Sequence, residues 1–532
     1  MIVPDDPREL GLAHPFWRKF QKQTVEKVLE SKKRFVIVEA PTGSGKTAIA
    51  IAAASLMKKK TTILTHTLRL QQQYLHECPT AILASGKSSY KCLINDEYRV
   101  SEAPCNVGWQ CRKKKICDYF IDKTKVASKQ TPLAVTNYSY WISNTSLEGG
   151  EGLAQNTEFL VCDEGHLAEL VLMSQVQIVL LRKEIEHLHI KFPESLPTIQ
   201  DAINWAQIVE PDLTRQNLEL TSYICNLPEE SIFSKMGLFR EIKRTKDVLR
   251  QVEKLLNMES IEGEDGHSNM FWIVDESPNR YEFKPIWAHS LKEHLFCGVS
   301  KVLIQSATFP ETMVKYLGLK AEEYDYIEVP STFPKENRPI YYWPVAYLKM
   351  GSPESEIIKV TKAIDSIIDS WGQSKGMIHT GNFTFLKKIK EYSRHANRFI
   401  THENCSAIEA MDKFRESSDG LLVSPSMTSG VDFPYEACEF QIIAKIPFPD
   451  LGDPQIKARR ETQEGRDWYS NTTLFTVEQT YGRVMRAEDD HGVTYILDSN
   501  FSRFYSMNIG NFSEHFREAV FKIDDLLEAS KL

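Results

Sequence analysis

The stretch A-P-T-G-S-G-K-T at residues 40–47 decides the fold of this 532-residue chain. An apolar run, R-F-V-I-V-E at 34–39, precedes it, and the helix-forming run A-I-A-I-A-A-A-S-L-M at 48–57 follows it. A strand, a glycine-rich turn and a helix in that order bring backbone N–H groups to a helix start, where they can bind phosphates. Lys46 is expected to reach the β- and γ-phosphates, and the Thr47 hydroxyl to ligate Mg²⁺. The predicted ATP-binding set is Thr42, Gly43, Ser44, Gly45, Lys46 and Thr47.

A second stretch predicts the catalytic acids. Asp163 and Glu164 end the apolar run F-L-V-C, 117 residues after Lys46. Asp163 is expected to hold Mg²⁺ through a coordinated water, and Glu164 to orient or deprotonate the attacking water. The alternative is an acidic surface turn without a function.

Further apolar runs predict the rest of the fold. They lie at 61–65, 133–136, 159–163 and 301–306, and again at 376–380, 420–424, 441–446 and 493–498. Uninterrupted apolar strands separated by helical segments are typical of parallel sheets covered on both faces. Two such sets predict an α/β protein with two lobes. The proline-bearing residues 329–339 are expected to link the lobes.

Two segments interrupt the first set of strands. Residues 80–130 are rich in Cys and Lys and have no strand rhythm. Residues 168–290 are mostly helical in pattern, with the clearest amphipathic stretch at 234–258. The run F-W-I-V-D-E-S-P-N-R-Y-E-F at 271–283 predicts a hairpin around a Ser-Pro-Asn turn.

The composition excludes several classes of protein. With 42% hydrophobic and 26% charged residues, the chain can bury sizeable cores and is not expected to be disordered. Its 64 Lys and Arg against 72 Asp and Glu give a net charge of −8, which excludes a globally basic binder but not a local basic patch. No run of ~18 apolar residues predicts a membrane span, and the first residues lack the pattern of a secretion signal. We therefore expect a cytoplasmic protein with reduced cysteines.

The second lobe contains V-E-Q-T-Y-G-R-V-M-R at 477–486. In a helix, Gln479, Arg483 and Arg486 would share one face and could point toward a partner surface. Arginines there could stabilise the γ-phosphate oxygens in the transition state from the opposite lobe. The alternative is a solvated basic helix face.

Four of the ten cysteines are clustered in the Lys-rich segment. They are separated by 12, 5 and 5 residues and are Cys92, Cys105, Cys111 and Cys117. Four thiolates suit either an iron–sulfur cluster or zinc, and their spacing does not decide between a metal site and a chance grouping.

These motifs together resemble superfamily 2 helicases, specifically the iron–sulfur XPD/DinG family. The match runs from Arg18 to Asp498 in the family's motif order. Besides the stretches above, it includes T-H-T-L-R-L-Q-Q-Q (65–73), S-A-T (306–308), G-M-I-H-T-G-N (376–382), S-M-T-S-G-V-D-F (426–433) and I-P-F-P-D-L-G-D-P (446–454). In D-E-G-H, Gly165 stands where the family usually has Ala. Both residues are small, so we expect activity to survive.

The resemblance implies two RecA-like parallel-sheet lobes, with an iron–sulfur insertion and a mostly helical, arch-like insertion in the first. The implied domains are 1–80 with 131–167 and 291–328 for the first lobe, 81–130 for the iron–sulfur domain, 168–290 for the arch-like domain and 329–532 for the second lobe.

The resemblance also implies roles for single residues. Arg18 and Gln21 would lie on the adenine side of the nucleotide, with Gln23 as a rival, and Gly430 and Asp432 would also bind it. The four clustered cysteines would hold a [4Fe–4S] cluster. The implied side-chain contacts to a nucleic-acid backbone are Thr67, Asn137, Thr380, Asn382 and Thr428.

A basic patch is expected near the cluster. Residues 86–130 hold 10 Lys and Arg against 5 Asp and Glu. The basic candidates for nucleic-acid contact are Arg112, Lys113 and Lys114, and nearby Trp109, Tyr119 and Phe120 could stack on bases or wedge a duplex junction. The alternative is a solvated charge run beside core aromatics.

The leading functional prediction is an ATP-dependent DNA helicase that acts as a monomer. It would bind ATP, Mg²⁺ and a [4Fe–4S] cluster, move along single-stranded DNA, by resemblance from 5′ to 3′, and unwind forked or tailed duplexes. One alternative is an RNA or RNA–DNA hybrid helicase, because phosphate contacts do not distinguish the sugars. Another is an ATP-gated single-strand binding protein that does not unwind.

Overall fold

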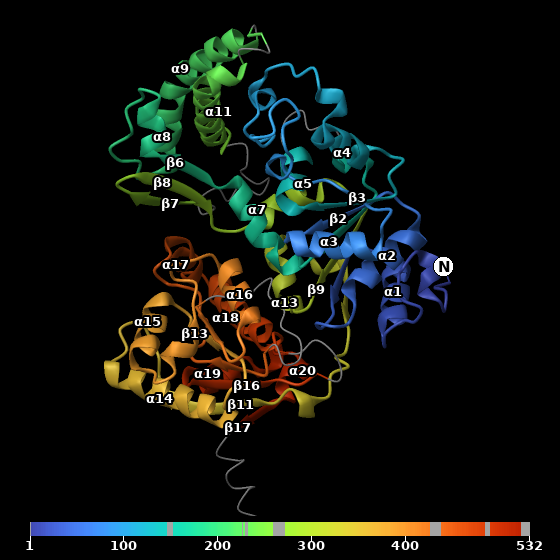
Figure 1. Cartoon of the computed structure of the whole chain (residues 1–532), viewed down its shortest axis with the longest axis vertical. Coiled ribbons are helices and arrows are strands. Elements are labelled where there is room, and N and C mark those ends of the chain that lie inside the picture. Colours follow the sequence, from blue (N-terminus) through green and yellow to red (C-terminus); the bar gives the residue numbers. More distant parts are fainter. Residues whose placement is uncertain are drawn as a thin grey trace, which may run out of the picture.

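The computed structural model describes residues 2–145, 153–225, 227–228, 232–258, 272–425, 438–484 and 490–522. Figure 1 shows two α/β lobes, with the long helices of the insertion and the Cys-rich segment away from the second lobe and the small sheet of the insertion facing it. The prediction of an α/β fold with two parallel-sheet lobes is confirmed.

The first lobe is built on a seven-stranded parallel sheet. Its strand order is β10 (Tyr324–Glu328), β1 (Phe35–Glu39), β9 (Lys301–Ser306), β5 (Phe159–Asp163), β2 (Thr61–Thr65), β4 (Leu133–Asn137) and β3 (Ile82–Leu83). Every residue of β1, β2 and β5 is buried. One face packs against α1 (Gln21–Glu30), α2 (Lys46–Met57) and α3 (Leu68–Glu77), and the other against α5 (Tyr138–Thr145), α7 (Ala168–Val176) and α12 (Lys292–Phe296).

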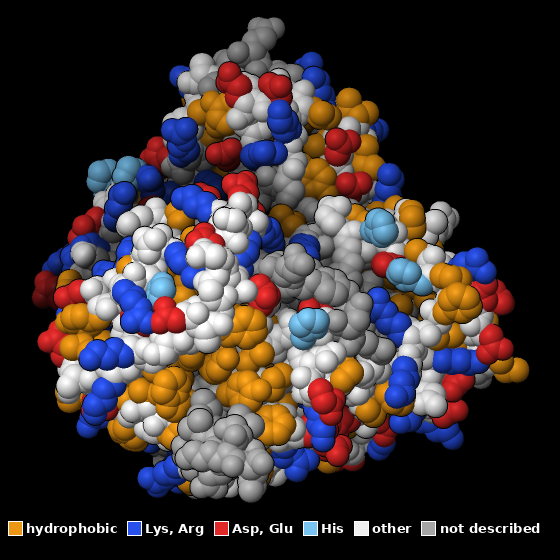
Figure 2. Space-filling model, turned by 60° about the horizontal axis from the view of Figure 1, so that its bottom comes forward, with side chains coloured by type: hydrophobic (Ala, Val, Ile, Leu, Met, Phe, Trp, Pro, Cys, Tyr) orange, Lys and Arg blue, Asp and Glu red, His pale blue; other side chains and the backbone are white. Residues whose placement is uncertain are grey.

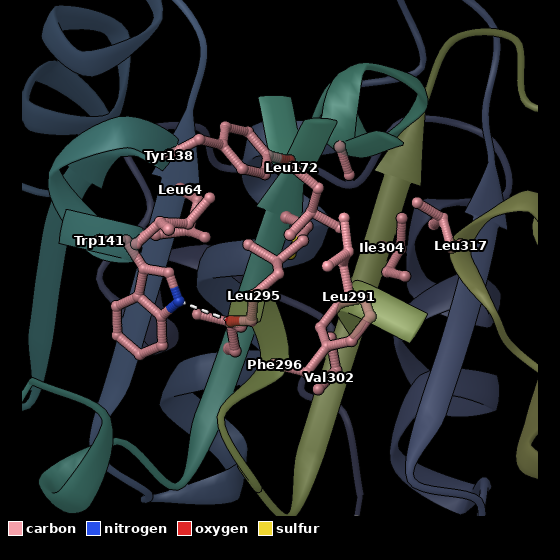
Figure 3. Close-up of a cluster of buried hydrophobic side chains, with 14 of the residues drawn as sticks. Leu64, Tyr138, Trp141, Leu172, Leu291, Leu295, Phe296, Val302, Ile304 and Leu317 are labelled. Carbon is pink, nitrogen blue, oxygen red and sulfur yellow. Dashed lines mark hydrogen bonds between the residues drawn. The ribbon is translucent and has the colours of Figure 1, made fainter. Parts of the chain in front are cut away.

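Figure 3 shows the core on the second of these faces. Trp141 and Leu172 come from α5 and α7, Leu295 comes from α12, and Ile304 comes from β9. The Trp141 indole N–H donates to the Leu295 carbonyl oxygen at 2.6 Å, so this buried ring leaves no polar atom without a partner. Helices far apart in the sequence are thereby fixed against the strands that end at the predicted site.

The second lobe is built on another seven-stranded parallel sheet. Its order is β13 (Phe399–Ile400), β14 (Leu421–Ser424), β12 (Gly376–His379), β15 (Phe440–Ile443), β16 (Val493–Asp498), β11 (Ile340–Ala346) and β17 (Val520–Lys522). Its helices are α14 (Glu354–Trp371), α15 (Phe383–Tyr392), α16 (Ala407–Glu416), α17 (Pro454–Arg460), α18 (Gln463–Tyr481), α19 (Asn500–Asn508) and α20 (Glu514–Arg517).

Several strands were not expected from the sequence. The strand β10 reads Y-D-Y-I-E, and β11 contains a proline. Both strands lie at or next to a sheet edge, where polar residues and proline are tolerated. The expected strand at 441–446 begins at Phe440 and ends at Ile443. Residues 329–339, the predicted linker, lie between β10 of the first sheet and β11 of the second.

The helical insertion combines two paired helices with a small sheet. The long helices α9 (Ile199–Cys225) and α11 (Met236–Leu256) pack together, and α8 (Arg182–His187) precedes them. The predicted hairpin is confirmed as β7 (Trp272–Ser277) and β8 (Arg280–Pro285). Its partner β6 (Ile178–Leu181) lies where a helix was expected, because this short apolar run pairs with β8.

The Cys-rich segment is mostly turns, followed by α4 (Asp118–Ala127). Val107 and Trp109 pack against Ile224 and Phe239 of the long helices, and the Trp109 indole donates to the Leu227 carbonyl at 3.3 Å. Trp109 and Tyr119 are only 7% and 4% exposed. The expectation that they stack on bases is therefore wrong for this structure, because both rings fill the core.

The charges on the surface are mixed. On the face in Figure 2, Lys and Arg are interspersed with Asp and Glu, in keeping with the small net charge of −8.

Of the helices in the described ranges, none combines the length and apolarity needed to span a bilayer. The remaining short helices are α6 (Leu153–Asn156) and α13 (Glu311–Val314).

Candidate nucleotide-hydrolysing site

The phosphate-binding turn lies between β1 and α2, as the sequence predicts. Gly43 and Gly45 have φ angles of 82° and 78°, in the left-handed region that favours glycine. No side chain caps the start of α2, which begins at Lys46. The Lys46 ammonium donates to the Ala40 carbonyl oxygen at 3.2 Å, so it lies across the turn whose N–H groups can bind phosphates.

The two acids lie at the end of β5. Asp163 is 2% exposed, and its Oδ1 accepts a hydrogen bond from Gln305 Nε2 at 3.0 Å. Burial, followed by the neighbouring charge of Glu164, raises the pKa of Asp163 to about 6. The charge of Lys46 acts in the opposite direction, so a cation beside Asp163 favours its ionised form. Glu164 has a φ of 52°, which turns the chain sharply after the strand.

His166 connects the acids to the rest of the site. Its Nδ1 lies 2.8 Å from Ser306 Oγ, at the end of β9, and 3.4 Å from Glu164 Oε2. Its ring lies 4.7 Å from that of Phe475, which belongs to α18 of the second lobe. Burial lowers the pKa of His166 to about 4, so the ring is neutral near pH 7.

The second lobe contributes to the same cavity. A cavity of about 340 Å³ is lined by Lys46, Asp163 and Glu164 from the first lobe and by Gln479 and Arg483 from the second. Gln479 and Arg483 line this cavity together, but not from one continuous helix face as expected, because α18 ends at Tyr481. Gly482 follows as its C-cap, and the Arg483 N–H donates to the Thr480 carbonyl in a turn. Arg486 lies outside the described residues.

Arg18 and Gln21 line the cavity, whereas Gln23 is exposed and does not. Gln21 Oε1 accepts from the Arg18 N–H at 2.7 Å. Its Nε2 donates to the carbonyls of Ser44 and Gly45 at 2.9 and 3.4 Å. Gln21 therefore stabilises the phosphate-binding turn through its side chain. The motif resemblance alone did not indicate this role. Gly430 and Asp432 lie outside the described residues.

Sequence reasoning missed several residues that line or support this cavity. Gln73 donates to the Thr47 hydroxyl at 3.0 Å, and Gln305 also donates to the Tyr74 hydroxyl at 3.0 Å. Phe16 is 80% exposed at the cavity wall and offers an apolar surface to a ligand. Gln73 stands inside the stretch T-H-T-L-R-L-Q-Q-Q, and Gln305 directly precedes S-A-T, so their positions next to these motifs are the sequence signal for both residues.

Three of the expected nucleic-acid contacts are helix caps. The side chains of Thr67, Asn137 and Asn382 accept hydrogen bonds from the backbone N–H groups of Leu70, Tyr140 and Phe385. These side chains cap the first turns of α3, α5 and α15, which begin after the carboxyl ends of strands.

The other expected contacts differ in exposure. Thr380 is fully buried and donates to the Asn382 carbonyl, so its side chain faces the interior instead of a nucleic acid. Arg112, Lys113 and Lys114 are exposed. Thr428 lies outside the described residues.

The four clustered cysteines surround one region. Burial, followed by the charges of Cys111, Cys92 and Cys117, raises the pKa of the Cys105 thiol to about 11, so the other three thiols lie within electrostatic reach of Cys105. Cys92 and Cys117 are buried, and none of the four forms a disulfide. In the described part of the chain, no three His, Cys, Asp or Glu side chains are arranged to hold one metal ion. Four thiols match the donor chemistry of either an iron–sulfur cluster or a zinc ion, and the described side chains are not arranged to hold either.

Replacing Gly165 by Ala is expected to destabilise the protein. A Cβ on Gly165 would lie 2.2 Å from Ile304 Cγ2, because Ile304 fills the space that a methyl group would need. We expect Gly165→Ala to lower the free energy of unfolding by about 1–3 kcal/mol through overpacking. Adding Ile304→Ala should recover part of this loss, so the double variant should lose less than the two single variants together. Denaturant unfolding measures all four proteins, and strictly additive losses would contradict the steric explanation.

A second cavity between the lobes predicts a dependence of stability on pH. It has about 350 Å³ and is lined by Glu39 of β1, Glu328 of β10 and Glu478 of α18. Burial, followed by the charge of Glu39, raises the pKa of Glu478 to about 8, although Ser513 N–H and Oγ donate to it at 2.8 and 2.9 Å. Burial likewise raises the pKa of Glu39 to about 7.

Since these folded-state pKa values lie above the ordinary value of 4.5, the folded state binds more protons than the unfolded state between about pH 5 and 8. The free energy of unfolding should therefore fall as pH rises through this range. Glu478→Gln should be neutral at pH 5 and stabilise by about 1–3 kcal/mol at pH 8. The exposed Glu514, which lines the same cavity, provides the control Glu514→Gln. Equal pH profiles for the two variants in thermal unfolding would refute the prediction.

Two family models match the chain. One is described as a helicase C-terminal domain and covers residues 370–518, and the other is described as the res subunit of type III restriction enzymes and covers residues 15–188. A probable ATP-dependent helicase of Methanocaldococcus jannaschii is 22% identical, with 92% of each chain covered. The ATP-dependent DNA helicase YoaA of Haemophilus influenzae is 20% identical, with 89% of each chain covered.

Solved structures share the fold. An XPD helicase has a TM-score of 0.59 at 16% identity, and the comparison covers 95% of this chain and 99% of that one. The S. tokodaii protein Xpd4 has a TM-score of 0.57 at 14% identity, with 95% and 100% covered. The similarity therefore extends over both lobes and both insertions.

Proposed function

We propose that this chain, which is of the XPD/DinG type of superfamily 2 helicases, couples ATP hydrolysis to movement along single-stranded DNA and so unwinds duplexes. The observation that carries this proposal is the cavity lined by Lys46 and Glu164 from one lobe and Arg483 from the other. A nucleotide held between two lobes can change their separation when it is bound and hydrolysed.

Each residue has a proposed part in hydrolysis. Lys46 binds the terminal phosphates, Thr47 and Asp163 hold Mg²⁺, and Glu164 orients the attacking water. Arg483 stabilises the charge that develops on the phosphate oxygens. When bound, Mg²⁺ supplies further positive charge to those oxygens. The residues fit this metal, because a buried carboxylate and a hydroxyl at the phosphate-binding turn are oxygen donors.

The remaining nucleotide contacts are proposed from the motifs. Arg18 lies at the turn beside Gln21, and Gln479 lines the cavity next to Arg483. We assign Arg486, Gly430 and Asp432 to the same site by their motif positions.

The strand-binding proposal rests on exposure and on the relatives. Arg112, Lys113 and Lys114 are exposed and can neutralise phosphates. The starts of α3, α5 and α15, capped by Thr67, Asn137 and Asn382, can contact a phosphate backbone without reading its sequence. DNA is favoured over RNA because the Haemophilus influenzae relative is a DNA helicase.

We further propose that Cys92, Cys105, Cys111 and Cys117 hold a [4Fe–4S] cluster. The support is the gathering of the four thiols around Cys105 in a segment that is mostly turns. When bound, such a cluster cross-links these turns and stabilises a segment with little core of its own.

An unwinding assay tests the motor. With ATP, the protein should displace the annealed strand of a 5′-tailed DNA duplex and leave a 3′-tailed duplex intact. ATP hydrolysis without displacement would make it an ATP-gated binding protein. Displacement on RNA tails alone would overturn the DNA assignment, and a lack of hydrolysis with single strands would overturn the motor itself.

Chemical analysis tests the cluster independently. Anaerobically purified protein should contain about four irons and four labile sulfides per chain. Cys111→Ser should lose them, whereas Cys405→Ser, in the second lobe, should keep them. Colourless wild-type protein with bound zinc would contradict the cluster.

A further inference from the structure

A buried arginine joins the two lobes away from the nucleotide cavity. Arg459, in the last turn of α17, is 1% exposed. Its guanidinium lies 4.6 Å from the ring centre of Trp287 and 4.2 Å from that of Trp468. Its Nη1 lies 3.0 Å from Glu169 Oε1. A planar cation between two aromatic rings and opposite a carboxylate is held in one orientation.

The partners of Arg459 come from different parts of the fold. Trp468 belongs to α18 of the second lobe, whereas Glu169 belongs to α7, which follows the catalytic acids in the first lobe. Trp287 follows β8 of the helical insertion. The Arg459 Nε also donates to the Ile286 carbonyl at 2.5 Å, and the Trp468 indole donates to Glu169 Oε2 at 3.4 Å. We call this set of Glu169, Trp287, Arg459 and Trp468 the arginine clamp.

The helix α18 runs from the clamp to the nucleotide cavity. Trp468 is near its first residue, and Tyr481 is its last, so the two are about 20 Å apart along the helix at 1.5 Å per residue. Between them, Phe475 contacts His166 of the first lobe. Beyond Tyr481 lies Arg483, at the cavity. The clamp thus holds one end of a rigid rod whose other end presents the arginine.

Burial makes the ion pair in the clamp mutually dependent. It raises the pKa of Glu169 and lowers that of Arg459, and the charge of each residue opposes the effect on the other. Removing one partner would strand a buried charge, so an informative variant must neutralise both.

We propose that Arg459 is a positioning residue, which through α18 sets the place of Arg483 and Gln479 against the bound nucleotide. The inference rests on the proposed function, since it assigns a role in the same hydrolysis reaction. This positioning role gives a reason for a buried charged pair at an interface between the lobes, where apolar side chains would also pack. A displacement of about 1 Å at a reacting group can slow a reaction up to a hundredfold.

The test compares ATP hydrolysis, with single-stranded DNA present, in matched variants. The double variant Glu169→Gln with Arg459→Gln should lose between about tenfold and a hundredfold in kcat, while KM for ATP changes less than about threefold. The adjacent Arg460, which is exposed and lies over the ring of Tyr469, provides the control Arg460→Gln with unchanged kinetics. A wild-type kcat in the double variant would overturn the proposal.

A double-mutant cycle separates positioning from general damage. In an Arg483→Ala background, the clamp variant should cause a much smaller further loss of kcat than in the wild type, because one of the two groups that it positions is already missing. Independent, multiplicative losses would overturn the proposal. If the double variant does not fold, Arg459→Lys, which keeps the charge but not the planar contact with the rings, replaces it in the same cycle. Wild-type protein without DNA-stimulated hydrolysis would instead refute the proposed function.

Discussion

Lys46→Ala is expected to abolish ATP hydrolysis, with a fall in kcat of about a thousandfold or more. The Lys46 ammonium lies over the phosphate-binding turn, in the cavity that also contains Asp163 and Glu164. Alanine removes the only charge of this turn that can follow the γ-phosphate during transfer. Single-strand binding without ATP should persist, because the exposed basic residues of the Cys-rich segment do not line this cavity.

Phosphate release at saturating ATP and DNA measures this effect. Lys59→Ala provides the matched control, since Lys59 lies just beyond the opposite end of α2 and does not line the cavity. The control should keep wild-type hydrolysis. Equal turnover by Lys46→Ala and wild type would refute the assignment of the nucleotide site.

Arg483→Ala should lower kcat by about a thousandfold, with a much smaller change in KM for ATP. Arg483 lines the nucleotide cavity from the second lobe and is 6% exposed. Its charge contributes to the lowered pKa of His166, so the guanidinium lies within electrostatic reach of the acid motif. A charge that stabilises mainly the transition state affects kcat more than ground-state binding.

The comparison variants are Arg483→Lys and Arg466→Ala. Lysine keeps a charge but not the planar fork, so it should restore only part of the activity. Arg466 is exposed near the start of α18 and pairs with Gln463 on the same helix, so its loss should leave kcat unchanged. Full activity of Arg483→Ala would refute the role assigned to Arg483 in hydrolysis.

Local patterns were sufficient for the framework of both lobes. Continuous apolar runs predicted β1, β2, β5 and β9, because strands buried on both faces contain little besides apolar residues. The edge strand β10 was missed because its polar and half-buried residues interrupt that apolar pattern. Short strands such as β13 have too few residues to show any periodicity.

Part of the candidate site was also readable in the sequence. The glycines of the phosphate-binding turn and the acids after β5 lie in contiguous stretches, whose backbone geometry depends on neighbouring residues. The end of α18 before Arg483 was not predicted. The sequence pattern is compatible with a helix that continues through Gly482, but the helix ends at Tyr481 and the chain turns. The burial of Trp109 was not predicted either, because its partners Ile224 and Phe239 are more than a hundred residues away.

The sequence by itself determined that this chain has a phosphate-binding turn, a pair of acids and two sets of parallel strands, because each depends on residues adjacent in the chain. Only the tertiary structure decided that Gln21 holds the turn, that Ile304 requires a glycine at 165 and that Arg459 joins the lobes between Trp287 and Trp468. These contacts join side chains from distant segments, and their distances depend on how complete elements pack.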